Sequence, residues 1–184
     1  MDAFEQLVAE ILWREGYWVR TSVKVELTRE DKEAIARKSS PRWEIDVVAY
    51  RARDNQLKAI ECKSYLDSRG VKLHAFDGSN DEAAKLFKLF NDTTLRRIVL
   101  DRLKVQFAES GACLPNASVA LCLACGRIAT NTDREGLRLH FAQRGWELWD
   151  EKWLRDRLRE MSEGGYENQV SAVVAKLLLR GTAS

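Results

Sequence analysis

Three charged residues, Asp46, Glu61 and Lys63, lie where packed strands would favour apolar side chains. They belong to the stretch 45–63, in which two runs rich in apolar and β-branched residues flank a polar segment at 53–56. Such runs around turn-forming residues are typical of a β-hairpin. The sequence therefore predicts a hairpin that carries two carboxylates and one ammonium group.

The register of this hairpin decides which of the three groups meet, because side chains alternate between the two faces of a strand. A two-residue turn at 54–55 would set Asp46 opposite Lys63. A four-residue loop at 52–55 would instead set Asp46 opposite Glu61. The two registers differ by two residues, so both keep all three side chains on one face.

Charges on a half-buried sheet face are costly unless they are paired or used in chemistry. Two carboxylates form a hard, oxygen-rich site suited to Mg²⁺, which keeps several water ligands and can share a substrate phosphate. A neighbouring lysine could position the attacking water, help to deprotonate it, or offset developing charge. A cross-strand salt-bridge cluster without catalytic function is the alternative, and the residues alone leave both interpretations open.

The spacing of these residues, Asp46 followed after fourteen residues by Glu61-Cys62-Lys63, resembles the core motif of the PD-(D/E)xK nuclease superfamily. Within it, the chain is most similar to the Mrr-like restriction endonucleases. The resemblance implies a restriction-endonuclease-like α/β core, a central mixed β-sheet flanked by helices, and metal-dependent hydrolysis of DNA phosphodiesters. It assigns Asp46 and Glu61 as ligands of Mg²⁺, for which Mn²⁺ can substitute, and Lys63 as a catalytic residue.

Other acids near the motif complicate this assignment. Glu44 stands where Mrr-like chains usually have glycine, which leaves the number of metal-binding acids open, and Ile45 replaces the proline of the superfamily name. The segment 3–15 predicts an amphipathic helix, followed by a strand from Tyr17. Glu5 in this helix corresponds by resemblance to a glutamate that lines the active site. An acid in the first turn is also favoured by the helix dipole alone.

Composition bounds the class of protein. The chain has 184 residues, of which 45% are hydrophobic and 32% charged, and this is long enough for one well-buried domain. The net charge of +2 means that a DNA-binding surface must come from local clusters of basic residues. No apolar run approaches transmembrane length and no signal peptide is evident, so we expect a cytoplasmic protein without a membrane partner.

The four cysteines are Cys62, Cys113, Cys122 and Cys125, and in a cytoplasm they would be reduced thiols. The pattern Cys122-Leu-Ala-Cys125 resembles half of a zinc site, but a strand would direct the two sulfurs to opposite faces. We therefore interpret the cysteines as small buried residues.

Basic residues gather after the hairpin. Two consecutive helices are predicted at 80–92 and 94–110, a helical insert outside the region of resemblance. Its cations, together with two in the preceding loop, form the best local candidate for binding DNA phosphates; they are Arg69, Lys72, Lys85, Lys88, Arg96 and Arg97. A solvated helix face balanced by acids is the alternative. The loop with Arg37, Lys38 and Arg42 is a second basic candidate.

The C-terminal part predicts strand, helix, strand and helix. The apolar run 117–125 is typical of a buried central strand, followed by a helix opened by a capping box at 132–135, a short strand at 146–149 and a helix at 151–161. The predicted domain thus covers 1–161, and 162–184 is a C-terminal tail with a helix near 169–180.

The sequence therefore predicts a magnesium-dependent DNA endonuclease, of restriction or defence type. The alternatives are a structure-specific repair or Holliday-junction-resolving nuclease and an inactive DNA-binding subunit. No separate target-recognition domain is evident, so specificity is expected from the insert or from a partner specificity subunit. A homodimer is the other assembly expected.

Overall fold

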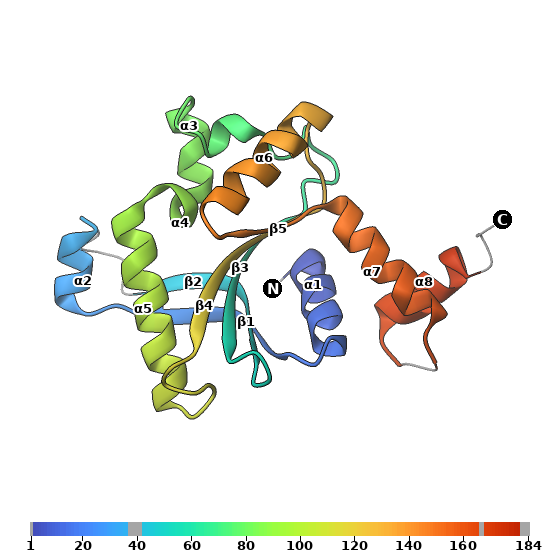
Figure 1. The fold of residues 1–184 in the computed structure, drawn as a ribbon, viewed down its shortest axis with the longest axis horizontal. Helices are drawn as coiled ribbons and strands as arrows, with labels where there is room; N and C mark the ends of the chain where they lie inside the picture. Colours follow the sequence, from blue (N-terminus) through green and yellow to red (C-terminus); the bar gives the residue numbers. More distant parts are fainter. Residues whose placement is uncertain (1, 37–41, 166–167, 181–184) are drawn as a thin grey trace.

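A five-stranded sheet forms the centre of the computed structural model, which describes residues 2–36, 42–165 and 168–180. The strands lie in chain order across the sheet (Figure 1); they are β1 (Trp18–Glu26), β2 (Arg42–Arg51), β3 (Gln56–Lys63), β4 (Ser118–Cys125) and β5 (Glu147–Trp149). β1, β2 and β3 pair antiparallel, whereas β3, β4 and β5 pair parallel. The predicted α/β class with a central mixed sheet is confirmed.

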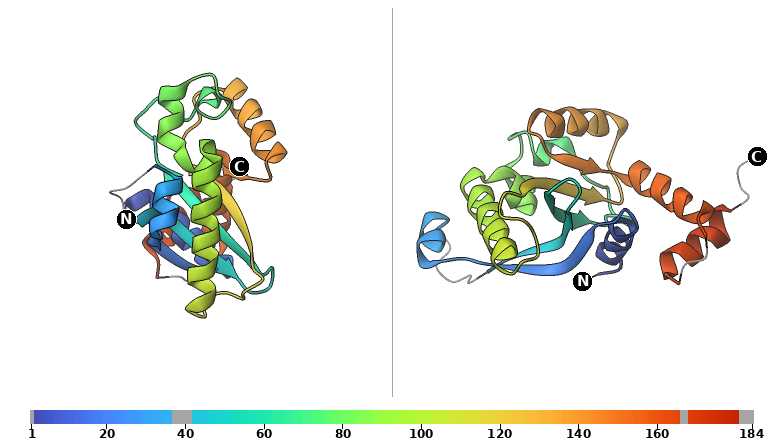
Figure 2. Two further views of the ribbon diagram at one scale, coloured as in Figure 1. Left: turned by 90° about the vertical axis from the view of Figure 1, so that its left-hand side faces the viewer. Right: turned by 60° about the horizontal axis from the view of Figure 1, so that its bottom comes forward.

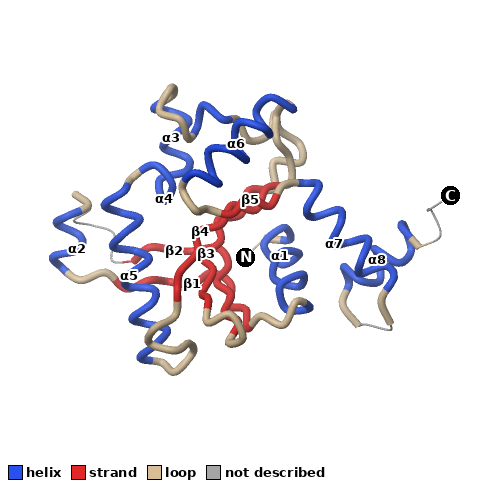
Figure 3. Tube along the Cα trace, viewed as in Figure 1, coloured by secondary structure: helices blue, strands red, loops and turns tan. Residues whose placement is uncertain are grey.

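Helices cover both faces of this sheet (Figures 1 and 2). One face carries α1 (Ala3–Arg14) and α7 (Glu151–Glu163), and α8 (Val170–Leu179) packs against α7 further from the sheet. The other carries α5 (Thr93–Glu109), the single-turn α4 (Lys88–Asn91) and α6 (Asn131–Gln143). The short elements α2 (Arg29–Ala34), η1 (Leu73–Ala75), α3 (Asp81–Ala84) and η2 (Lys85–Phe87) lie in the connections (Figure 3).

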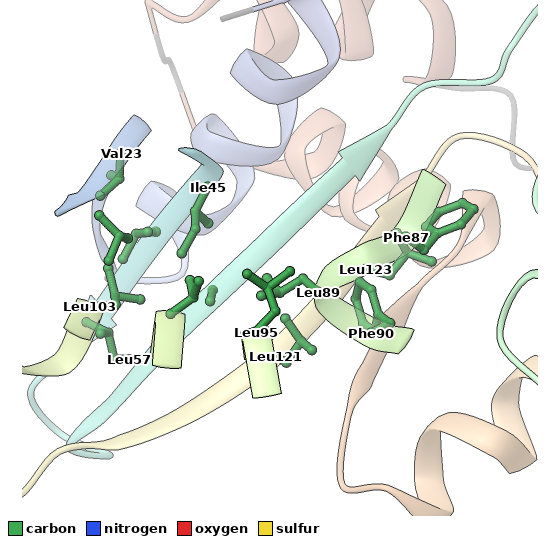
Figure 4. Packing of buried hydrophobic residues seen from close by; sticks show 14 of the residues in the cluster. Val23, Ile45, Leu57, Phe87, Leu89, Phe90, Leu95, Leu103, Leu121 and Leu123 are labelled. Carbon is green, nitrogen blue, oxygen red and sulfur yellow. The ribbon is translucent and has the colours of Figure 1, made fainter. Parts of the chain in front are cut away.

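Alternation along the strands divides the apolar side chains between two cores. Leu57 and Ala59 of β3 belong to the core under α5, whereas Ile60 and Cys62 belong to the core under α1. We call these the α5-side and α1-side cores. Figure 4 shows the α5-side core extending along the sheet, from Leu57 and Leu103 at one end, through Leu95 and Leu121, to Phe87 and Phe90 at the other. Both faces of the central strands are therefore buried, as is usual for the parallel part of a sheet.

Most predicted elements are present within two residues of their expected ends, and the central position of β4 is as predicted. Cys122 lies in the α1-side core and Cys125 in the α5-side core, so the two sulfurs do face apart. The cap of α6 was placed wrongly: Thr130, rather than Thr132, is the N-cap and accepts from the Asp133 amide. Arg37 and Lys38 lie outside the described residues. Among the described helices, none combines the length and apolarity needed to span a membrane.

The single helix predicted at 80–92 is wrong. The chain there forms α3, η2 and α4, and the break falls at Phe87, whose φ of −129° and ψ of 51° are not helical. The break allows Phe87, Leu89 and Phe90 all to enter the α5-side core, which a continuous helix at this position would not bury together. Asn91 holds the broken segment, because its Nδ2 donates to the carbonyls of Ala75, Ala84 and Phe87.

We expect Asn91→Asp to lower the free energy of unfolding by about 1–2 kcal/mol, because it removes the donor and turns a carboxylate toward three carbonyl oxygens. Chemical denaturation monitored by circular dichroism measures this change. The control is Asn131→Asp, the same substitution in the first turn of α6, where an acid is favoured by the helix dipole. Equal stability of the two variants would contradict the role of Asn91.

Candidate active site

The four-residue loop, and not the two-residue turn, closes the hairpin. The outermost pair is Arg51↔Gln56, and residues 52–55 form the loop. Asn55 has φ of 48°, in the left-handed region that asparagine tolerates. Its side chain is fixed on both sides, because Oδ1 accepts from the Tyr50 hydroxyl at 3.1 Å and Nδ2 donates to Asn116 at 3.0 Å. This register, continued past its last pair Val47↔Ile60, sets Asp46 opposite Glu61.

Asp46 occupies an interruption of the sheet. β1 and β2 pair at Thr21↔Val47 and again at Val23↔Ile45, but the rung between them, Ser22 with Asp46, is unpaired. Ser22 has φ of 51°. Both strands change face here: Val47 lies in the α1-side core, and Ile45, two residues away, lies in the α5-side core. Asp46, between these two residues, is half-buried.

The carboxylate of Asp46 lies instead at the level of the sheet. Its Oδ2 accepts a hydrogen bond of 2.7 Å from the backbone N–H of Cys62. This amide lies beyond the last β2–β3 pair, so the carboxylate satisfies a donor that the ladder leaves open. Asp46 is thereby directed at the chain between Glu61 and Lys63.

Glu61 and Lys63 form an ion pair on the same strand. The Lys63 Nζ lies 2.7 Å from Glu61 Oε1, and their side chains are 25% and 17% exposed. Among the described residues, no hydrogen bond or ion pair joins Asp46 directly to either of them. The three groups predicted from the sequence are nevertheless brought together, since Asp46 and Lys63 perturb each other's pKa.

Burial dominates the electrostatics of the two acids. It raises the pKa of Asp46, against the opposing effects of the Cys62 amide and the Lys63 charge. It likewise raises the pKa of Glu61, although Lys63 acts in the opposite direction. For Lys63, burial alone would lower the pKa, but the carboxylate of Glu61, helped by Asp46, outweighs it and the pKa is raised. Lys63 is therefore protonated at neutral pH, and both carboxylates are held in an environment that disfavours their charge.

The N-terminus of α1 adds acids around this centre. Asp2 caps the helix by accepting from the amides of Phe4 and Glu5, each at 2.8 Å, and Glu5 completes a capping box by accepting from the Asp2 amide at 3.2 Å. Asp2 raises the pKa of Asp46, and Glu5 contributes to the raised pKa of the buried Cys62 thiol. Glu5 thus lies near the centre, with a defined capping function.

Asp2 was missed in the sequence analysis. The pattern Asp2-x-x-Glu5 before an apolar stripe is itself a helix-start signal and could have identified the N-cap. The cap lies beside Asp46 because α1 packs across β2 and β3. A local sequence pattern does not contain this tertiary contact. Glu44 is exposed, and its charge also raises the pKa of Asp46.

The predicted DNA-binding residues occupy different environments. Arg69, Lys85, Lys88 and Arg97 are exposed, while Lys72 and Arg96 are half-buried. Lys85 pairs with Glu82, and Arg97 lies 4.0 Å from Asp101. Arg96 differs most, because its Nη1 donates to the Phe90 carbonyl at 2.7 Å and its guanidinium packs over Trp146. Arg96 therefore also holds the fold together.

Comparison with known proteins finds no family model, no curated protein and no solved structure that matches this chain. Its assignment must come from the fold and the site. The fold defines an α/β protein with a mixed sheet, and the site is a half-buried cluster of two acids and a lysine on its central hairpin.

We expect Asp46→Asn to stabilise the protein at neutral pH by a few degrees in its thermal midpoint. Asparagine keeps an acceptor for the Cys62 amide and removes the buried charge. The folded state holds the Asp46 proton more tightly than the unfolded chain does, so the wild type loses stability as the pH rises from about 4 through the raised pKa. The advantage of Asp46→Asn should therefore vanish near pH 4.

Calorimetry across this pH range measures the effect, with Asp67→Asn in the exposed loop after β3 as the matched control. A lower midpoint for Asp46→Asn at neutral pH would contradict it, and would show that the Asp46 charge is part of a stabilising salt-bridge cluster.

Proposed function

We propose that this protein is a metal-dependent endonuclease that hydrolyses phosphodiester bonds in DNA, with Asp46, Glu61 and Lys63 as its catalytic centre. The observation that carries the proposal is the carboxylate of Asp46 bonded to the Cys62 amide, between a glutamate and a lysine that form an ion pair. The resemblance of this motif to the PD-(D/E)xK superfamily and its Mrr-like branch supports the same activity.

The donor atoms suit a hard divalent cation. Each acid has one oxygen committed, Oδ2 of Asp46 to Cys62 and Oε1 of Glu61 to Lys63, which leaves Oδ1 and Oε2 for a further ligand. In the described part of the chain, no group of three or more His, Cys, Asp or Glu residues is arranged to hold a metal. Mg²⁺ commonly takes only one or two carboxylates and completes its shell with water and substrate phosphate, so two acids suffice.

The cation also suits the electrostatics. A nearby positive charge lowers the pKa of a carboxylate and so offsets the burial that raises the pKa of both acids. When bound, Mg²⁺ would lower the pKa of a coordinated water and polarise a phosphoryl oxygen. Asp46 and Glu61 would hold it, and Asp46 is oriented for this by the rigid backbone of β3 through the Cys62 amide.

Lys63 contributes a positive charge rather than a base. Its pKa is raised by Glu61 and Asp46, so at neutral pH the amine is protonated and cannot accept a proton from water. The ammonium can contact a phosphate oxygen and stabilise the negative charge that develops in the transition state. Of the three functions that the sequence left open for this lysine, we assign charge stabilisation.

We expect Mn²⁺ or Mg²⁺ to raise the thermal midpoint of the wild type at pH 7.5, because the cation binds the folded carboxylates. The shift should be lost in Asp46→Asn and in Glu61→Gln and kept in Asp67→Asn. It should shrink as the pH falls through the raised pKa values, since protons compete for the same oxygens. An equal shift in all four proteins would place the cation elsewhere.

We expect Lys63→Ala to retain this metal-induced shift and to lose on the order of 10²–10³-fold in the rate of DNA cleavage, the usual cost of removing one charge-stabilising group. Incubation of supercoiled, linear and branched DNA with Mg²⁺, Mn²⁺ or EDTA measures cleavage and separates a general endonuclease from one specific for junctions. Asp46→Asn and Glu61→Gln should be as inactive together as each alone, because they disable one unit.

Lys24→Ala, at an exposed position on β1, is the control for loss of a lysine. Undiminished cleavage by Lys63→Ala would refute the catalytic assignment, even if the metal still binds.

A further inference from the structure

A basic groove of about 440 Å³ lies between α5, the start of β4 and the loop before β5. Its charged lining consists of four cations and one acid: Arg96, Arg97, Lys104, Arg144 and Asp101. Backbone and side chains of Ser118 and Trp146 complete its walls. No residue of this groove belongs to the candidate active site.

Two guanidinium groups in the groove gather on one indole. The Cζ atoms of Arg96 and Arg144 lie 4.9 Å and 5.5 Å from the centroid of the Trp146 ring. Cation–π attraction draws both arginines to the ring, but their like charges repel. Accordingly, burial and the charge of Arg144 lower the pKa of Arg96 from its usual value.

The protein itself offsets these charges only in part: the charge of Asp92 acts on Arg96, against the effects of burial and Arg144. Arg96 donates to the Phe90 carbonyl and the Thr93 hydroxyl, and Arg144 donates to the His140 carbonyl at 3.4 Å, all of them uncharged acceptors. Within the described residues, no carboxylate forms an ion pair with Arg96, Lys104 or Arg144. Asp101 reaches only Arg97, at 4.0 Å. The groove is therefore prepared for an external anion.

We propose that this groove binds the phosphates of a nucleic-acid backbone. Several cations along an open groove suit a polyanion, and guanidinium groups suit the paired oxygens of phosphate. The groove does not provide an aromatic surface on which a base could stack. The Trp146 ring already packs against both arginines and against the rings of Phe90 and Phe141. The choice of DNA as the polyanion rests on the proposed function.

The groove lies apart from the chemistry. Ser118 and Leu121 in its wall pair with Gln56 and Ala59, which are seven and four residues before Lys63 on β3, a separation of roughly 13–23 Å at about 3.3 Å per residue. Changes in the groove should therefore alter DNA binding and leave the chemical step at saturating DNA unchanged.

The test measures binding of a labelled DNA duplex in EDTA, by fluorescence anisotropy over a series of salt concentrations. Arg144→Glu and Lys104→Glu reverse groove charges without removing the main-chain bonds of Arg96. Each should weaken binding at least several-fold and flatten the salt dependence, by about 0.9 in slope for each lost phosphate contact. Lys152→Glu, an exposed position in the first turn of α7, applies the same charge change outside the groove and should leave both quantities unchanged.

Unchanged affinity and slope in the groove variants would overturn the proposal, and so would an equal loss in Lys152→Glu. A second arm measures thermal stabilisation by inorganic pyrophosphate. Stabilisation that the groove variants lose, with duplex affinity intact, would overturn the backbone assignment in favour of a small phosphate ligand. Because binding is measured without metal, failure here is separate from failure of the catalytic assignment, which the cleavage of Lys63→Ala tests.

Discussion

The hydrogen bond from the Cys62 amide to Asp46 is the contact on which the candidate site depends. It forms where β1 and β2 both change face at one rung, opposite Ser22, with the half-buried Asp46 between Val47 of one core and Ile45 of the other. A carboxylate at an ordinary rung would be buried among apolar residues at a cost of several kcal/mol. Here it replaces a missing ladder partner and stays ionisable beside Glu61 and Lys63.

A second buried lysine on β3 shows what a structural ion pair looks like in this protein. Lys58 is 6% exposed, pairs with Glu147 of β5, and lies within 6 Å of the rings of Tyr17 and Trp149. The pair joins the sheet to its edge strand and is enclosed by aromatic rings. The Lys63 side chain, at 25% exposed, is more open than that of Lys58 at 8%, whereas Glu61 at 17% is less exposed than Glu147 at 35%. Asp46 adds a second negative charge beside the Lys63–Glu61 pair. Two acids beside one lysine leave an excess of negative charge at a position that solvent can reach. This favours a binding function for the cluster over a purely structural one.

Local patterns predicted the strands and the long helices because alternation and helical periodicity record which face is buried. They left the hairpin register open, since the choice depends on Asn55 contacting Asn116, 61 residues away. They failed at 80–92, where apolar spacing matched a helix but three side chains had to enter one core. Local patterns also made Arg96 resemble a surface cation. Its carbonyl partner Phe90 and the Trp146 ring come together around it only through tertiary packing, which the local sequence does not record.

The basic groove and the acids Asp46 and Glu61 lie in different parts of the fold, and this separation affects whether the proposed site needs a bound cation. At physiological salt, charges more than about 8 Å apart are largely screened where solvent lies between them. The groove of Arg144 and Lys104, which we propose holds a polyanion, lies roughly 13–23 Å from Lys63 along β3. Its charges therefore cannot cancel the repulsion between a phosphate and the acids Asp46 and Glu61. Lys63 is already paired with Glu61. If the site acts on a phosphodiester, as we propose, positive charge must therefore be added at the two carboxylates themselves before a phosphate can approach them, and a divalent cation on their uncommitted oxygens would supply it.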